Sequence, residues 1–181
     1  MTILPPVLHE AHLPLAERMA ARLDGELFGL GDGHCAIDEI ERPVLRALGV
    51  LGARPRRLIG ELGTAAWIWG ALPLVPTHLE FCVDLQARAR PAPTPLSTVR
   101  EVVLLASDVV DLGDARVMSP IRTAVDLARS RERFGPDDAA TVRALAVVAG
   151  FGLADCVELM DRRRNLPAKR RAVERLRAAL G

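Results

Sequence analysis

The stretch Val117–Ser130, VMSPIRTAVDLARS, decides the fold because it turns the end of a strand directly into a helix. Ser119 offers a side-chain oxygen for the N-cap, and Pro120 occupies the first helical position, where a missing N–H costs nothing. The following spacing of i, i+3, i+4 and i+7 predicts a helix that packs one apolar stripe against the rest of the protein. The stripe consists of Ile121, Ala124, Val125 and Ala128.

Arg122 breaks the local pattern of this segment, because the helix dipole disfavours a cation in the first turn. Asp126 follows four residues later and Arg129 three residues after that. Two interpretations stay open. Either these three side chains form an ion pair on the surface or between domains, or Arg122 grips a carboxylate or phosphate from elsewhere. In both cases the motif organises a contact and contains no nucleophile, so Arg122 is a candidate partner-binding residue.

The composition limits the classes of protein to consider. Half of the 181 residues are apolar, which suffices for a packed core in one sizeable domain or two small ones. Only 3% are aromatic, which argues against a single-strand nucleic-acid binder and against an aromatic-lined pocket. Cys35, Cys82 and Cys156 are too far apart for a disulfide framework or a zinc site. Since no signal peptide or membrane span is recognisable, we expect a cytoplasmic protein.

Positive charge is concentrated near the C-terminus. Between Asp161 and Arg177, eight basic residues accompany two acidic ones, so this segment carries +6 and the rest of the chain −5. Three interpretations are open: a face that is solvated or neutralised by the acidic remainder, a phosphate-binding face for DNA or RNA, or a face for an acidic partner protein. The candidate nucleic-acid-binding residues are Arg162, Arg163, Arg164, Lys169, Arg170, Arg171 and Arg175.

The N-terminal part, residues 1–55, is expected to form a reduced winged-helix-like lead. After a loose proline-bearing arm, the spacing of apolar residues predicts a helix over Leu15–Leu23. A glycine-bearing turn at Gly31-Asp32-Gly33 then joins two strands of a hairpin. A helix followed by a hairpin is the closing part of a winged helix. A short helix over Val44–Leu51 ends this part.

Residues 56–133 are expected to form an α/β core and residues 134–181 a helical cap with a basic face. The core begins with a glycine-bearing helical segment that contains Trp67 and Trp69, which point in different directions. One tryptophan is expected in the core and the other at a domain boundary, so Trp69 is a candidate partner-binding residue. Together the elements predict an α/β (α+β) fold with a small mixed sheet and packed helices. The predicted strands are Leu79–Leu85, Val99–Leu105 and Val109–Met118.

Three segments resemble a known family. GELGTAAWIWGA at Gly60–Ala71 and RVMSPIRTAVDLARS at Arg116–Ser130 are similar to the "AAWLHG"-like helix and the "TSPxRTAxDLAR" segment of AbiEi-type antitoxins of type IV toxin–antitoxin (abortive-infection) systems. DGELFGLGDGHCAID at Asp24–Asp38 resembles the wing that ends their DNA-binding module, and the arginine-rich tail also fits. The resemblance covers roughly residues 15–180. It implies a non-enzymatic protein that opposes a nucleotidyltransferase-type toxin and represses its own operon.

The chain also departs from this family pattern. Only one helix precedes the hairpin, where a complete helix-turn-helix would have more, and Cys35 stands where a tyrosine is usual at the end of the wing. The resemblance therefore supports an antitoxin role more than operator binding through the N-terminus.

The alternative is a nucleotidyltransferase-like enzyme, or a decayed relative that acts as an interaction scaffold. Metal-dependent nucleotidyl transfer needs two carboxylates that hold a pair of ions about 4 Å apart. Asp84 ends a predicted strand, but Cys82 stands two residues before it, and Glu80 would lie about 13 Å away along the strand. The acidic pair required for this chemistry is therefore missing from the strand.

Other catalytic patterns are missing from the sequence as well. His9 and His12 are expected to be solvated in the N-terminal arm rather than to bind a metal. No Walker lysine and no dinucleotide-binding glycine motif occurs. The sequence therefore predicts a non-enzyme with no catalytic residue, no metal and no cofactor. The expected partners are a cognate toxin and, through the basic face, DNA, but no membrane.

Overall fold

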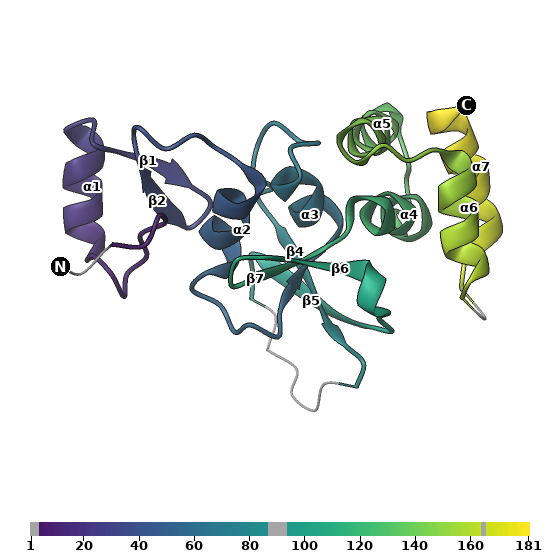
Figure 1. Ribbon diagram of the computed structural model, residues 1–181, viewed down its shortest axis with the longest axis horizontal. Coiled ribbons are helices and arrows are strands. Elements are labelled where there is room, and N and C mark those ends of the chain that lie inside the picture. The colour runs from purple at the N-terminus through teal and green to yellow at the C-terminus, as the bar shows by residue number, and fades with distance from the viewer. Residues whose placement is uncertain (1–3, 87–93, 164–165) are drawn as a thin grey trace.

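The computed structural model describes residues 4–86, 94–163 and 166–181. The chain runs from one end of an elongated molecule to the other, with the N-terminal helix and hairpin at one end, a sheet in the middle and four helices at the other end (Figure 1). Within the described residues, seven α-helices accompany a two-stranded and a five-stranded sheet. The predicted α/β (α+β) class is therefore confirmed.

The N-terminal part consists of α1 (Leu15–Leu23), the antiparallel strands β1 (Leu27–Leu30) and β2 (Gly33–Ala36), and α2 (Pro43–Leu51). Leu30 pairs with Gly33, so the hairpin turn has two residues instead of the predicted three. Gly49 in α2 lets the hairpin approach closely, because a Cβ atom there would lie 2.5 Å from the Leu30 carbonyl oxygen. The same helix packs on the main sheet and joins the hairpin to the core.

The described part of the N-terminal arm is not loose. Val7 and Leu8 are buried, and Leu8 exchanges backbone hydrogen bonds of 2.8 and 3.0 Å with His34 of β2. His9 is only 6% exposed, and its Nε2 atom lies 3.0 Å from the Leu48 carbonyl oxygen. The prediction of a loose arm with a solvated His9 is therefore wrong, because the arm fills the space between the hairpin and α2.

The central sheet has the strand order β5-β4-β3-β7-β6. The outer β5 runs parallel to β4 and the short β3 runs parallel to β7, whereas the other neighbours are antiparallel. Strands appear close to the three predicted segments, the last of which is divided in two by a turn. The bounds are β3 (Ile59–Gly60), β4 (Leu79–Asp84), β5 (Ser97–Val102), β6 (Val109–Leu112) and β7 (Ala115–Met118).

The helix that contains Trp67 is shorter than the glycine-bearing sequence pattern suggests. Its first residues form β3, which pairs with two strands at once, and α3 (Leu62–Ile68) follows after a sharp turn. Leu62 stands at this turn with a positive φ of 48°, which is unfavourable for a residue other than glycine because the Cβ atom crowds the backbone. The pairing of β3 in the middle of the sheet explains why the helix begins late.

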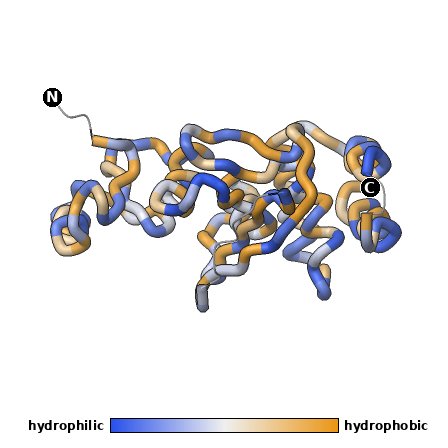
Figure 2. The backbone as a smooth tube through the Cα atoms, turned by 90° about the horizontal axis from the view of Figure 1, so that it is seen from below, coloured by the Kyte–Doolittle hydropathy of each residue, from blue (hydrophilic) through white to orange (hydrophobic). Residues whose placement is uncertain are grey.

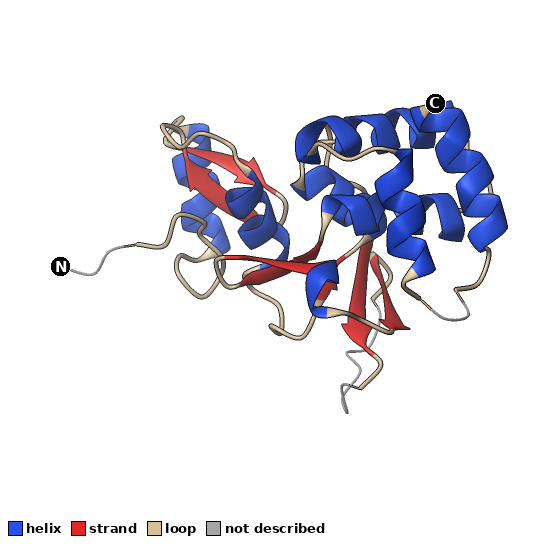
Figure 3. Cartoon of the chain, turned by 45° about the vertical axis from the view of Figure 1, so that its right-hand side comes forward, coloured by secondary structure: helices blue, strands red, loops and turns tan. Residues whose placement is uncertain are grey.

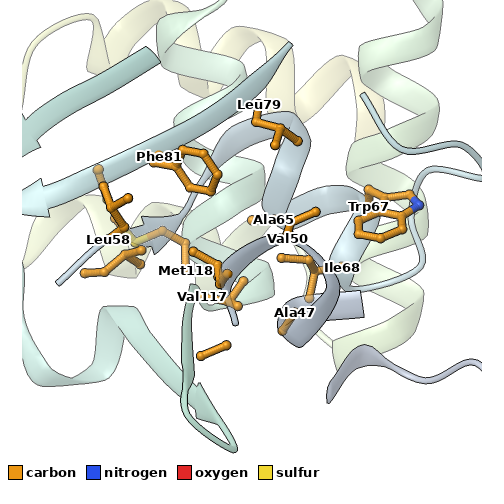
Figure 4. Packing of buried hydrophobic residues seen from close by; sticks show 14 of the residues in the cluster. Ala47, Val50, Leu58, Ala65, Trp67, Ile68, Leu79, Phe81, Val117 and Met118 are labelled. Carbon is orange, nitrogen blue, oxygen red and sulfur yellow. The ribbon is translucent and has the colours of Figure 1, made fainter. Parts of the chain in front are cut away.

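The apolar residues form two cores. The first lies between the sheet, α2 and α3, around Phe81, Val50 and Met118 (Figure 4). The second joins α3 to the C-terminal helices. Trp67 belongs to the first core, whereas Trp69 packs against both and donates an Nε1–H hydrogen bond of 2.7 Å to the Met118 carbonyl oxygen. The prediction that one tryptophan lies in the core is confirmed for Trp67, and Trp69 lies where the two cores meet.

The C-terminal helices pack beside one another at one end of the molecule (Figure 3). Apolar and hydrophilic stretches alternate along them (Figure 2), as expected for helices that bury one side. Carboxylates of Asp138 and Asp155 accept backbone N–H groups just before the second and third of these helices. The four helices are α4 (Pro120–Ser130), α5 (Pro136–Ala149), α6 (Leu153–Asp161) and α7 (Lys169–Leu180).

The start of α4 differs from the prediction in one respect. Ser119 does occupy the N-cap position before Pro120, and most of the predicted apolar stripe is buried. However, the Ser119 hydroxyl is buried without a hydrogen-bond partner among the described residues, so it does not cap the helix. The hydroxyl of Thr123 instead donates to the Ser119 carbonyl oxygen at 2.9 Å.

Candidate functional site

A buried ion network joins the edge of the sheet to the C-terminal helices. Asp108 ends the 3-10 turn η1 (Ala106–Asp108) and is fully buried. Its carboxylate accepts hydrogen bonds from Arg122 of α4 at 2.9 Å, from the backbone N–H of Leu105 at 2.9 Å, and from Arg163, which follows α6. One carboxylate thus holds together the strand edge, α4 and the end of α6.

Asp126 extends this network along α4. Its two oxygens accept hydrogen bonds from Arg122 at 2.8 Å and from Arg129 at 2.5 Å. Burial opposes the charge of Arg122 most strongly, but the carboxylates of Asp126 and Asp108 outweigh it and raise the pKa of Arg122. The structure combines parts of the two interpretations of Arg122: it pairs with Asp126, but in the interior and not on the surface, and it also grips the Asp108 carboxylate from another segment.

Glu61 forms a second buried ion pair beside this network. The strained turn at Leu62 places Glu61 under the sheet, where it is 1% exposed and accepts two hydrogen bonds from Arg100 of β5 at 2.6 and 2.7 Å. Burial raises the pKa of Glu61, and the hydrogen-bonded carboxylate raises the pKa of Arg100. Sequence reasoning missed this pair; an acidic residue at a strand-to-helix junction was its only local signal.

Glu80, one of the two carboxylates considered for nucleotidyl transfer, is held by arginine as well. Arg131 donates to both of its oxygens at 2.9 Å, and the backbone N–H of Gly63 adds a third bond of 2.8 Å. A Cβ atom at Gly63 would come within 2.9 Å of the same carboxylate, so a larger residue there would displace the Glu80 side chain. Asp84, at the end of β4, accepts the backbone N–H of Gln86 at 3.0 Å. Across the described residues, no group of three or more His, Cys, Asp or Glu is placed to hold a metal ion.

A cleft of about 490 Å³ opens over the ion network. One side of the cleft is formed by β5 and the loop that follows it, and another by α4. The third side is formed by residues 162–163 and 166–167, between α6 and α7. Five guanidinium groups line it, together with the carboxylates of Glu101 and Asp126 and several apolar side chains. The lining residues are Arg100, Glu101, Val102, Val103, Leu105, Arg122, Asp126, Arg129, Arg162, Arg163, Leu166 and Pro167.

Three of the predicted nucleic-acid-binding residues use their guanidinium groups inside the protein. Arg163 is bonded to Asp108, as described above. Arg171 donates to the Arg129 carbonyl oxygen at 2.7 Å, and Arg175 donates to carbonyl oxygens just after α4, at 2.7 Å from that of Arg131 and 3.1 Å from that of Glu132. These groups satisfy carbonyls that the end of a helix leaves without partners.

The other predicted basic residues lie closer to solvent. Arg162 pairs with Glu158, Lys169 with Asp161, and Arg170 with Glu174. The side chain of Arg170 is 95% exposed, the largest value in these pairs. Arg164, the seventh residue of the predicted set, lies outside the described residues. Some residues of the basic segment therefore bind other segments of the protein, and the others form a solvated face.

The three cysteines are buried and free. Burial raises the pKa of Cys35 to about 11 and that of Cys156 to about 12, and it raises the pKa of Cys82 even more. Because the thiolate is the nucleophilic form, these thiols are unsuited to nucleophilic catalysis near neutral pH. Their position in the two cores identifies them as packing residues.

Comparisons with known proteins give a fold but no family. No family model and no curated protein matches the chain. A solved structure, that of the RV2827C protein from Mycobacterium tuberculosis, is similar with a TM-score of 0.51 and 18% sequence identity. The similarity covers 97% of this chain and 72% of the other. At this identity the likeness concerns the fold alone. Within the described residues no single helix is long and apolar enough to cross a membrane; α5 and α6 pass that test only as a pair bent by 92°.

Proposed function

We propose that the protein is a non-enzymatic, antitoxin-like protein of a type IV toxin–antitoxin system, which acts in the cytoplasm against a cognate toxin through a functional or a physical interaction. The resemblance of Gly60–Ala71 and Arg116–Ser130 to AbiEi-type antitoxins supports this proposal. The charged residues of the second segment build the network that fixes the C-terminal helices on the sheet. The charged residues of this segment therefore act in holding the fold together and not as reactive groups.

The observation that carries the proposal is the state of the buried carboxylates. Glu61, Glu80, Asp108 and Asp126 each accept at least two hydrogen bonds, and each has an arginine partner. Carboxylates held by guanidinium groups have their lone pairs occupied and their charge neutralised, whereas catalytic metal ions need carboxylates that remain available as ligands. These four carboxylates therefore hold structural elements together, which favours a protein that acts through its surfaces.

The decisive test of this function is protection against a toxin. The gene adjacent to this one in its genome would be expressed in a bacterial host, with and without the protein, and colony counts would be compared. The proposal expects a toxic neighbour whose effect is relieved by the wild type and equally by Asp84→Ala, because the contact of this carboxylate among the described residues is to a local backbone N–H. No protection by the wild type would overturn it.

An enzymatic outcome is distinguished by a second assay. The purified protein would be incubated with Mg²⁺, labelled nucleoside triphosphates and total RNA. The proposal expects no transfer of label. Transfer that disappears in Asp84→Ala would replace the antitoxin proposal by a nucleotidyltransferase, since Asp84 is the carboxylate at the end of β4 that no arginine is seen to hold among the described residues.

We further propose that the protein contributes to transcriptional regulation, with DNA contacts on the solvated part of the basic face. Arg162, Lys169 and Arg170 have side chains that are 39–95% exposed, whereas Arg171 and Arg175 are bonded to carbonyl groups. Binding to operator DNA should therefore weaken with salt at a logarithmic slope no steeper than about −3, at about −0.9 per phosphate neutralised. A slope near −6 would show that the bonded arginines also reach DNA.

A further inference from the structure

We infer that the arginine-lined cleft is a binding site for a ligand of nucleotide size that carries phosphate. The cleft holds about 490 Å³, within the range of pockets that take small molecules. Its guanidinium groups come from β5, α4 and the end of α6, so they converge from three directions. Planar guanidinium groups match the geometry of phosphate oxygens better than any other side chain. This inference does not depend on the toxin proposal.

The buried charges beneath the cleft include more guanidinium groups than carboxylates. Four guanidinium groups meet three buried carboxylates, so one positive charge remains beneath the cleft. The four are Arg100, Arg122, Arg129 and Arg163, and the three are Glu61, Asp108 and Asp126. Two further acidic groups are solvent-exposed: Glu101 on the lining, which offsets this charge at the surface, and Glu158, which pairs with Arg162.

Arg129 is the residue most directly affected by this excess. Burial lowers its pKa most strongly, and the neighbouring charges of Arg122 and Arg100 lower it further, against the effect of Asp126. A bound phosphate would offset this repulsion. Arg129 is also held in place, because its Nε donates to the Pro167 carbonyl oxygen at 3.1 Å and its Nη1 to Asp126 at 2.5 Å. A guanidinium group that is already ordered loses little entropy when a ligand binds.

The rest of the lining indicates the kind of molecule that carries the phosphate. Val103, Leu105, Leu166 and Pro167 form an apolar wall beside the guanidinium groups. Val103 and Leu105 are 67% and 44% exposed, so their apolar surface is available to a ligand. A body such as a nucleoside could cover this wall while its phosphates contact the arginines. A free inorganic anion would leave the wall uncovered and should bind more weakly.

Two matched pairs of residues make the inference testable without disturbing the fold. Arg162 lines the cleft and Arg170 does not, but each forms an exposed i,i+4 pair with a glutamate. The partners, Glu158 and Glu174, have the same side-chain exposure of 62%. Substitutions in the two pairs should therefore cost the same small amount of stability, and only those at the cleft should change binding.

The experiment is isothermal titration of the full chain with ATP, pyrophosphate, inorganic phosphate and adenosine. ATP is expected to bind more tightly than pyrophosphate and phosphate. Adenosine is expected to bind at least about tenfold more weakly than ATP, because it lacks the phosphates and at least one charge-assisted contact with them. Arg162→Gln should weaken ATP binding about threefold to tenfold, and Arg170→Gln should leave it unchanged. Glu158→Gln should strengthen binding because it releases Arg162, whereas Glu174→Gln should not. A gain in affinity cannot arise from misfolding.

The source of the phosphate is resolved by a further arm with short RNA that ends in a 5′-phosphate or a 5′-hydroxyl. If the phosphorylated RNA binds more tightly than ATP, the site takes an RNA end; if ATP binds more tightly, it takes a free nucleotide. Both results support a phosphate site. The inference is overturned if ATP shows no binding at millimolar concentration, if adenosine binds as tightly as ATP, or if Arg162→Gln and Arg170→Gln weaken binding equally. Loss of toxin protection in cells would not bear on any of these outcomes.

Discussion

The two ends of the molecule are attached to its centre in different ways. At the N-terminal end, Arg18 is the buried residue of α1, and it donates to the Leu13 carbonyl oxygen at 3.0 Å and lies 3.2 Å from His34 Nδ1. At the C-terminal end, seven residues of α4 are buried, and two of them, Arg122 and Asp126, belong to the carboxylate network. Arginine is the fastener at both ends, but its partners are mainly neutral at one and charged at the other.

This difference indicates how each end should respond to change. A neutral acceptor that loses its arginine donor leaves only an unfilled hydrogen bond, which costs about 1–3 kcal/mol when buried. A carboxylate or guanidinium group that loses its partner leaves a buried charge, which costs more. The C-terminal attachment should therefore be the more sensitive of the two to a single substitution.

The largest effect is expected for Asp108→Asn. The substitution removes the charge that Arg122 and Arg163 share and turns an amide group toward one of them. We expect the free energy of unfolding to fall by about 3–5 kcal/mol, measured by urea denaturation. Asp114→Asn is the control, because its pair with Arg56 is exposed and should matter by less than about 1 kcal/mol. Equal losses for the two variants would contradict the proposed role of the network.

A smaller and local effect is expected for Arg18→Met. The apolar stem remains, but the contact with His34 of the hairpin, the hydrogen bond to the Leu13 carbonyl oxygen and the pair with the exposed Glu10 are lost. Amide hydrogen exchange in α1 should speed up by about tenfold to a hundredfold, corresponding to about 1–3 kcal/mol, while exchange in β4 stays unchanged. Arg22→Met in the same helix is the control, since Arg22 is exposed. If α1 is unaffected by Arg18→Met, its attachment depends on something other than this arginine.

The same contrast explains which features sequence reasoning could predict. The helix after Ser119 was predictable because its apolar stripe repeats locally, and the hairpin because a glycine lies between two strands. Asp108 and Arg163 are 55 residues apart, and Arg100 and Glu61 are 39 apart. Such pairs have no signature in the local pattern, because only the folded sheet brings them together. The cleft that Arg100 and Arg163 line was therefore not predicted.

Two local predictions were wrong for physical reasons that tertiary contacts supply. The arm before α1 has several prolines and looks loose, but Leu8 pairs with β2 and His9 is buried against α2. Ser119 has the residue type of an N-cap, but its hydroxyl is buried without a partner among the described residues, and Thr123 bonds to its carbonyl instead. In both cases the residue types indicated where the helix begins, but they did not indicate which contacts the preceding residues make.

The smallest effect is expected from mild acidification, and it should appear at the N-terminal end. Burial lowers the pKa of His9 and His34, and for His34 the charges of Arg18 and Arg22 lower it further. Below the ordinary pKa of 6.5 the unfolded chain therefore binds protons that the folded chain refuses, so stability present above pH 6.5 is lost as pH falls. Linkage limits the loss to about 1.4 kcal/mol per pH unit for each such proton.

The measurement is hydrogen exchange at pH 7.5 and pH 5.5, corrected for the intrinsic pH dependence of exchange. Protection should fall in β2, which contains His34, and in α1, whose Arg18 contacts His34. It should fall less in α7, which is held by guanidinium groups that stay charged. His34→Gln should remove part of the difference, because a glutamine cannot take up the proton. An equal loss of protection at both ends would mean that the carboxylate network titrates in the same pH range as the histidines. The two attachments would then respond alike to pH, against the expectation from their different arginine partners.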